Sequence, residues 1–112
     1  MSAEKLAAVI PVDDLAEAVD RWTTLLGVEA TFVDGDRWAQ FDVGGTRLAL
    51  AGADRSDDRP GLLVKVPDVA AYRSELVGQG ISVSEIERGP HELRCVVDGP
   101  GGFAVTFYSP AG

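Results

Sequence analysis

Few residues in this sequence combine the type and the spacing that catalysis requires. His91 is the single histidine, so a catalytic triad or a multi-histidine metal site would have to be built around it alone. Glu92 follows directly, but consecutive side chains on a strand point to opposite faces, so the two cannot act together on one ligand. We therefore interpret His91 as a solvated residue at the start of a strand.

Two other motifs that could bind ions have simpler structural explanations. The segment 99–102 (Gly-Pro-Gly-Gly) is rich in glycine, but a phosphate-binding loop needs a following helix and usually a lysine, whereas a strand is expected here. The pairs Asp13-Asp14 and Asp57-Asp58 lack the spaced oxygen donors of a calcium loop. We interpret 99–102 as a turn, Asp14 as a helix cap and the second pair as part of a solvated acidic stretch.

The composition is that of one small folded domain with an acidic surface. Of the 112 residues, 46% are apolar and 25% are charged, as in ordinary globular chains. The 18 Asp and Glu residues exceed the 10 Lys and Arg residues, and the net charge of -8 repels nucleic acid phosphates and anionic lipids. We expect a cationic or neutral small ligand, with no nucleic acid and no membrane as partner.

The sequence also predicts a cytoplasmic protein. No apolar run approaches the ~20 residues of a membrane-spanning helix, and the first residues lack the cationic and apolar regions of a secretion signal. Cys95 has no second cysteine to pair with and lies within an apolar strand pattern, so we interpret it as a buried structural thiol.

The first half of the chain predicts a strand, a helix and three further strands. The aliphatic run 5–12 has the composition of a strand. Asp14 is placed to cap a helix whose apolar residues recur at helical spacing and which ends at Gly27. Residues 28–51 then alternate with a period of two, with turns predicted at 34–36 and 44–45, which gives three antiparallel strands.

The second half repeats this order of elements. A strand is predicted over 62–66, and Asp68 caps a helix that ends at Gly80. Three strands are predicted over 81–87, 91–98 and 103–108.

Two duplicated modules within one domain explain this repetition. The motif at 12–15 (Val-Asp-Asp-Leu) recurs at 66–69 (Val-Pro-Asp-Val). The polar segment 52–60 has no periodicity and is expected to be a linker. The prediction is a single domain over 1–112, with modules at 1–51 and 61–112.

Five short motifs occur in a fixed order along nearly the whole chain. They are Val12-x-Asp14-Leu15, Leu25-Leu26-Gly27-Val28, Gly44-Gly45-x-x-Leu48-x-Leu50, Val66-x-Asp68-Val69 and Asp98-Gly99-Pro100-Gly101-Gly102. This pattern resembles the vicinal oxygen chelate superfamily, which includes glyoxalase I, extradiol dioxygenases, fosfomycin-modifying enzymes and bleomycin resistance proteins. The resemblance implies an α+β fold of two tandem βαβββ modules, whose curled sheets form a cleft, in a homodimer.

The resemblance also implies four metal-ligand positions, and none carries an ordinary ligand here. Metal-using members place His, Glu or Gln on the first and last strands of each module, and the corresponding residues are Ala7, Ala49, Gly61 and Thr106. Ala and Gly have no side-chain donor, and a Thr hydroxyl is a poor ligand for a divalent transition metal ion. The resemblance thus indicates the branch without metal or other cofactor, exemplified by bleomycin resistance proteins that sequester a cationic drug.

Alternation along the strands predicts which residues face the helices and which face the cleft. The apolar sets expected to cover the helices are Phe41, Val43, Leu48 and Leu50 in the first module, and Leu93, Cys95, Val97, Val105 and Phe107 in the second. The opposite sets combine aromatic and polar side chains, which is typical of a small-molecule site, although such charges could also pair with each other on an exposed sheet. The candidate ligand-binding residues are Trp38, Gln40, Asp42, Arg47, Leu63, Glu92, Arg94, Thr106 and Tyr108, with Ala49, Lys65 and Val96 on the same faces.

Two main classes of function fit these observations. One is a protein that binds a small aromatic or cationic ligand, such as an antibiotic or a metabolite, with Trp38 and Tyr108 stacking on it. The other is an enzyme of the same fold: a lyase, an isomerase or a dioxygenase-like protein. It would use Asp42, Glu92 or Tyr108 as acid or base, or hold a metal through His91, Glu92 and Asp42. A partner domain without a cofactor is a third class, which an apolar outer patch would favour.

Overall fold

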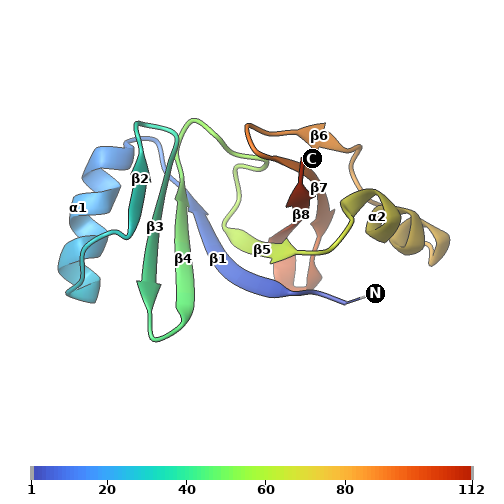
Figure 1. Cartoon of the computed structure of the whole chain (residues 1–112), viewed down its shortest axis with the longest axis horizontal. Coiled ribbons are helices and arrows are strands. Elements are labelled where there is room, and N and C mark those ends of the chain that lie inside the picture. The colour runs from blue at the N-terminus through green and yellow to red at the C-terminus, as the bar shows by residue number, and fades with distance from the viewer. Residues whose placement is uncertain (1, 112) are drawn as a thin grey trace. The chain divides into compact units, whose positions relative to one another are not determined.

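The computed structural model describes residues 2–111, which form two compact units (Figure 1). The first unit is Ala7–Pro60, and the second unit consists of the residues up to Leu6 together with those from Gly61 onward. Within residues 2–111, each half of the chain contributes elements in the order strand, helix, strand, strand, strand. This order confirms the predicted α+β class and the repeated βαβββ module.

The sheet of the first unit has the strand order β2-β3-β4-β1. Strand β3 is antiparallel to both β2 and β4, as predicted, whereas β4 runs parallel to β1. The elements are β1 (Lys5–Pro11), α1 (Leu15–Leu26), β2 (Phe32–Asp34), β3 (Trp38–Val43) and β4 (Thr46–Ala51).

Helix α1 begins and ends where the sequence predicts. Asp14 is its N-cap, and the Oδ1 atom of Asp14 accepts a hydrogen bond from Glu17 N–H at 3.1 Å. Gly27 ends the helix with φ at 72°, a left-handed conformation that favours glycine. Leu15 is buried against Phe41 and Leu50, so the apolar stripe of α1 determines which face of the sheet lies in the core.

The sheet of the second unit has the strand order β5-β8-β7-β6, and β5 runs parallel to β8. Its core contains Val64, Val66, Val69 and Cys95, and the rings of Tyr72 and Phe107 pack at its edge with centroids 5.1 Å apart. The elements are β5 (Gly61–Lys65), α2 (Val69–Gly78), β6 (Glu87–Arg88), β7 (Glu92–Asp98), the short 3-10 helix Pro100–Gly102 and β8 (Ala104–Pro110).

Cys95 is buried and free, as the sequence predicts. Burial raises the pKa of its thiol, because the thiolate would be desolvated there. The thiol therefore serves as a small apolar side chain in the core of the second unit.

The strand predicted over 81–87 is wrong for most of its length. Residues 81–86 form no strand; Glu87–Arg88 pairs with β7, and Ser84 N–H donates to Val96 O at 3.0 Å. Side chains make the other contacts that a strand would make here. Val96 N–H donates to the Ser84 hydroxyl at 2.8 Å, and Arg73 donates to two carbonyls, Ser84 O at 2.7 Å and Val83 O at 3.4 Å. These carbonyls are satisfied without a strand partner.

Two members of the predicted core faces lie outside the cores. Val43 is 46% exposed, because it is the last residue of β3 beside the turn at 44–45. Val97 is only partly buried and is not part of the core cluster of the second unit. The other residues expected to cover the helices contribute to one of the two clusters.

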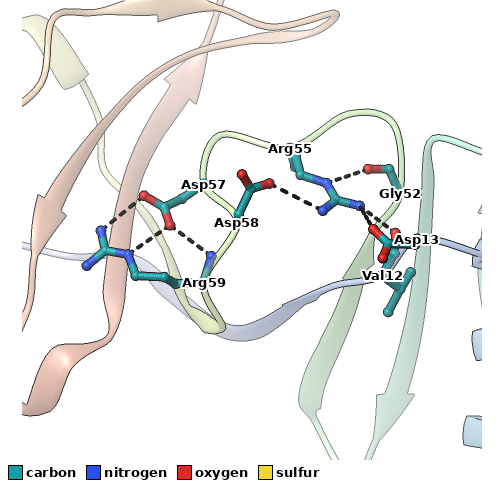
Figure 2. Close-up of polar contacts among 7 residues, drawn as sticks. All are labelled: Val12, Asp13, Gly52, Arg55, Asp57, Asp58 and Arg59. Atoms are coloured by element: carbon teal, nitrogen blue, oxygen red, sulfur yellow. Dashed lines mark hydrogen bonds and ion pairs between the residues drawn. The ribbon is translucent and has the colours of Figure 1, made fainter.

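The segment 52–60 has no helix or strand, but side chains hold it in place (Figure 2). Arg55 donates to the carbonyl oxygens of Val12 and Gly52, the latter at 2.8 Å, and also pairs with Asp58 at 3.3 Å. Its side chain is only 24% exposed. This segment is therefore anchored to the end of β1 within the first unit.

The start of α2 supplies a test of how the second unit is held together. Val69 N–H, at the first turn of the helix, donates to the hydroxyl of Ser109 on β8 at 3.0 Å, and both residues are buried. We expect Ser109→Ala to lower the free energy of unfolding by about 1–3 kcal/mol, because a buried N–H loses its acceptor. Urea denaturation measures this. Ser74→Ala, at an exposed position on the same helix, is the control and should change stability by less than about 0.5 kcal/mol; equal effects of the two substitutions would contradict the prediction.

Candidate functional site

Each sheet has one face against its helix, and we call the opposite face the helix-free face. On β3 and β4, Phe41 and Leu50 belong to the core beneath α1, so their alternating neighbours lie on the helix-free face of the first unit. The same argument holds for the second unit, where Cys95 and Phe107 lie in the core. The helix-free faces carry Trp38, Gln40, Asp42, Arg47 and Ala49 in the first unit, and Leu63, Lys65, Glu92, Arg94, Val96, Thr106 and Tyr108 in the second.

Aromatic and amide groups are neighbours on the helix-free face of the first unit. Trp38 Nε1 donates to Gln40 Oε1 at 3.1 Å, which leaves the amide nitrogen of Gln40 as a donor. Gln40 lies opposite Phe32 of β2 on one side and opposite Ala49 of β4 on the other. Phe32 is 50% exposed and is not among the candidate residues named from the sequence, although its position two residues before Asp34, at the predicted turn, places it on the same face as Asp34.

Asp42 is engaged by two partners on the same face. Arg47 Nε donates to Asp42 Oδ1 at 2.9 Å, and the Thr31 hydroxyl donates to Asp42 Oδ2 at 2.6 Å. The hydrogen bond from Arg47, followed by that from Thr31, lowers the pKa of Asp42. A carboxylate that is held ionised in this way is a weak base, which argues against Asp42 as a proton acceptor.

The helix-free face of the second unit has a polar row beside an apolar one. The polar row runs across four strands as Glu87, Arg94, Tyr108 and Lys65, since each is the register partner of the next. The adjacent row consists of Val96, Thr106 and Leu63. A phenol and a cation therefore lie beside a row that we call the apolar strip: the aliphatic side chains of Val96 and Leu63, with the buried Thr106 between them.

Arg94 holds both carboxylates that are nearest to it on this face. Its Nη2 atom lies 2.8 Å from Glu87 Oε1, and its Nη1 atom lies 3.2 Å from Glu92 Oε1. The Arg94 side chain is only 11% exposed, so these pairs are shielded from water more than an ordinary surface pair is. Glu92 is consequently committed to Arg94, while His91 is exposed and precedes β7.

No ordinary metal donor stands at the four positions that the resemblance implies. Within residues 2–111, no three His, Cys, Asp or Glu side chains are grouped closely enough to hold a metal ion. Ala49 and Thr106 are buried, and Gly61 lies against β8. A Cβ atom on Gly61 would lie 1.8 Å from Ala104 O, so no residue with a side chain fits there unless the backbone shifts.

Comparison with known proteins establishes the family. The sequence profile of the Glyoxalase/Bleomycin resistance protein/Dioxygenase superfamily matches residues 6–107, and the chain belongs to this superfamily. No curated protein sequence matches the chain. In residues 2–111 there is no helix of the length and apolar character needed to cross a membrane.

Solved structures share the fold at low sequence identity. A structure described as an NAD-dependent benzaldehyde dehydrogenase from Legionella pneumophila has a TM-score of 0.83 at 15% identity, covering 95% of this chain and 99% of that chain. A superfamily member from Vibrio splendidus 12B01 has a TM-score of 0.67 at 13% identity, with coverage of 95% and 97%. Methylmalonyl-CoA epimerase from Mycobacterium tuberculosis has a TM-score of 0.68 at 24% identity, with coverage of 98% and 90%. These likenesses concern the fold.

The close approach at Gly61 makes a substitution there costly. We expect Gly61→Ala to lower the free energy of unfolding by about 3 kcal/mol or more, because the added methyl group overlaps Ala104 O. Gly78→Ala is the matched control: a Cβ atom there meets nothing within 4 Å, and Ala favours the helix by up to about 1 kcal/mol. Thermal and urea denaturation of both variants measure the difference, and a stable Gly61→Ala protein would show that β5 and β8 are not so close.

The partners of Asp42 give a second test, by titration. Because the pKa of Asp42 is lower in the folded chain than its ordinary value of 3.8, the pair with Arg47 stabilises the fold above that value, and this contribution is lost as the pH falls through the lowered pKa. NMR titration of the carboxyl carbon should show that Arg47→Gln raises the pKa of Asp42 more than Thr31→Val does. Asp42→Asn identifies the signal. An Asp42 that titrates at or above 3.8 in the unmodified protein would contradict the contacts described.

Proposed function

We propose that this chain is a small-molecule-binding member of the superfamily that works without a metal ion and sequesters its ligand, an antibiotic or a metabolite, without transforming it. The observation that carries the proposal is the set Ala7, Ala49, Gly61 and Thr106 at the implied ligand positions. A missing donor at one position could be replaced by a neighbour, but at Gly61 the backbone itself leaves no room for a side chain. A site of this kind offers shape and hydrogen bonds to a guest and no Lewis acid.

The helix-free faces support binding of a flat organic molecule. Trp38 and Phe32 offer aromatic surface beside the amide of Gln40, and Tyr108 does so beside Leu63. Aromatic side chains with a few placed polar groups are the usual lining of small-molecule sites.

The alternative of an enzyme with a carboxylate as acid or base has less support. Both oxygens of Asp42 accept hydrogen bonds, from Arg47 and Thr31, and Glu92 is paired with Arg94. Neither carboxylate is free to take a proton from a substrate without first giving up an ion pair.

The proposal includes a cytoplasmic homodimer and a single domain over 1–112, with modules 1–51 and 61–112 joined by 52–60. An association between copies would remove exposed apolar side chains such as Leu25, 72% exposed, and Val33, 51% exposed, from water.

Binding of a neutral flat probe tests the proposal directly. We expect naphthalene-2-carboxamide to shift the amide NMR signals of strands β3 and β4, and to raise the free energy of unfolding by ~2.7 kcal/mol at 100 times its Kd. Trp38→Ala should weaken this binding about tenfold, because a stacking contact is worth about 1 kcal/mol beyond the buried area.

Phe103→Ala is the control for the aromatic substitution. Phe103 is 53% exposed and lies in the loop before β8, so its removal should leave the Kd unchanged. Addition of zinc, nickel or cobalt should change neither the Kd nor the melting temperature. A divalent ion that remains bound in stoichiometric amount after dialysis would contradict the proposal.

A further inference from the structure

Within residues 2–111, Lys65 is a cation without an ion pair, on a face where Arg94, Glu87 and Glu92 are paired. It is the last residue of β5 and is partly buried on the helix-free face of the second unit. Among the described residues, no ion pair includes Lys65, whereas Arg94 on the same face has two carboxylate partners. Because Glu87 and Glu92 are held by Arg94, they are not available to neutralise Lys65.

The neighbours of Lys65 determine which kind of ligand could bind beside it. Tyr108 is its register partner on β8, and Leu63 and Thr106 form the next row of the same face. An ammonium group and a phenol thus flank an apolar strip. This arrangement suits a molecule with an apolar body and one anionic group, since the ammonium gains a partner when the anion binds.

We infer that the second unit selects an organic carboxylate, with Lys65 as the counter-ion and the apolar strip as the support for its body. The inference rests on the proposed function and names the chemical class of its ligand. It also differs from what the net charge of -8 suggests, because Glu87 and Glu92 on this face are already paired with Arg94.

Three compounds of equal shape test the charge preference. They are naphthalene-2-carboxylate, naphthalene-2-carboxamide and 2-naphthylmethylammonium. The Kd of each for the second unit is measured on the full chain from the amide NMR signals of strands β5 and β8. We expect the carboxylate to bind about tenfold more tightly than the amide, and the ammonium compound to bind most weakly. The preference should shrink as salt is added, because the pair is only partly buried.

Substitutions at Lys65 and at a control arginine show whether Lys65 causes the preference for the carboxylate. Lys65→Gln should abolish the preference for the carboxylate while leaving the Kd of the amide unchanged, and Lys65→Arg should retain the preference. Arg88→Gln is the matched control: Arg88 is exposed, lies opposite Leu93 and thus on the other face of the same sheet, and should retain the preference. The melting temperature of each variant confirms that it is folded.

The outcomes separate the inference from the proposed function. If the compounds bind but the carboxylate has no advantage, or if Lys65→Gln and Arg88→Gln behave alike, the inference is wrong and the proposed function stands. If none of the three compounds binds, the proposed function fails and the inference fails with it. Tightest binding of the ammonium compound would also overturn the inference.

Discussion

A single helix can bury only one face of a sheet, and this constraint decides where chemistry is possible in each unit. Side chains alternate along a strand, so placing Phe41 and Leu50 against α1 forces Gln40 and Asp42 onto the opposite face. The caps at Asp14 and Gly27 fix the length of the helix, and hence how much of the sheet it covers. The polar and aromatic residues of the helix-free faces are therefore consequences of core packing as much as of selection for a ligand.

The contact between β5 and β8 adds a constraint at the level of the backbone. A side chain on one strand can take over the role of a side chain on the next strand. A glycine cannot be substituted in this way when a carbonyl oxygen of the next strand occupies the space that a Cβ atom would need. Gly61 is such a residue, with Ala104 O in the space that its side chain would need. A ligand for a metal ion at this position would require β8 to move, and β8 also supplies the buried hydroxyl of Ser109 to α2.

The elements that depend on local sequence could be predicted, and those that depend on distant side chains could not. Caps and alternation act over a few residues, which is why the bounds of α1 and the faces of β3 and β4 follow from the sequence. The contacts of Arg73 with Ser84, of Arg55 with Val12 and of Ser109 with Val69 join residues 11, 43 and 40 positions apart. The first replaces a predicted strand and the second anchors a predicted linker. The ion pair of Arg94 with Glu87 also depends on the tertiary fold. The residues of this face could therefore be predicted from the sequence, but which of their charges are paired with each other could not.

Net charge is a poor guide to the ligand of a protein of this kind, because it does not say which carboxylates are neutralised. Glu17 and Asp20 lie on α1, and Asp57 and Asp58 lie in the segment 52–60, outside the strands that form the helix-free faces. Three of the carboxylates that do lie on those faces have arginine partners: Asp42 pairs with Arg47, and Glu87 and Glu92 pair with Arg94. Charges separated by more than about 10 Å in water are largely screened at moderate salt, so the groups beside a bound ligand outweigh those elsewhere. The acidic surplus therefore sets the average charge of the surface, whereas the proposed recognition of an anion depends on the local charge beside Lys65.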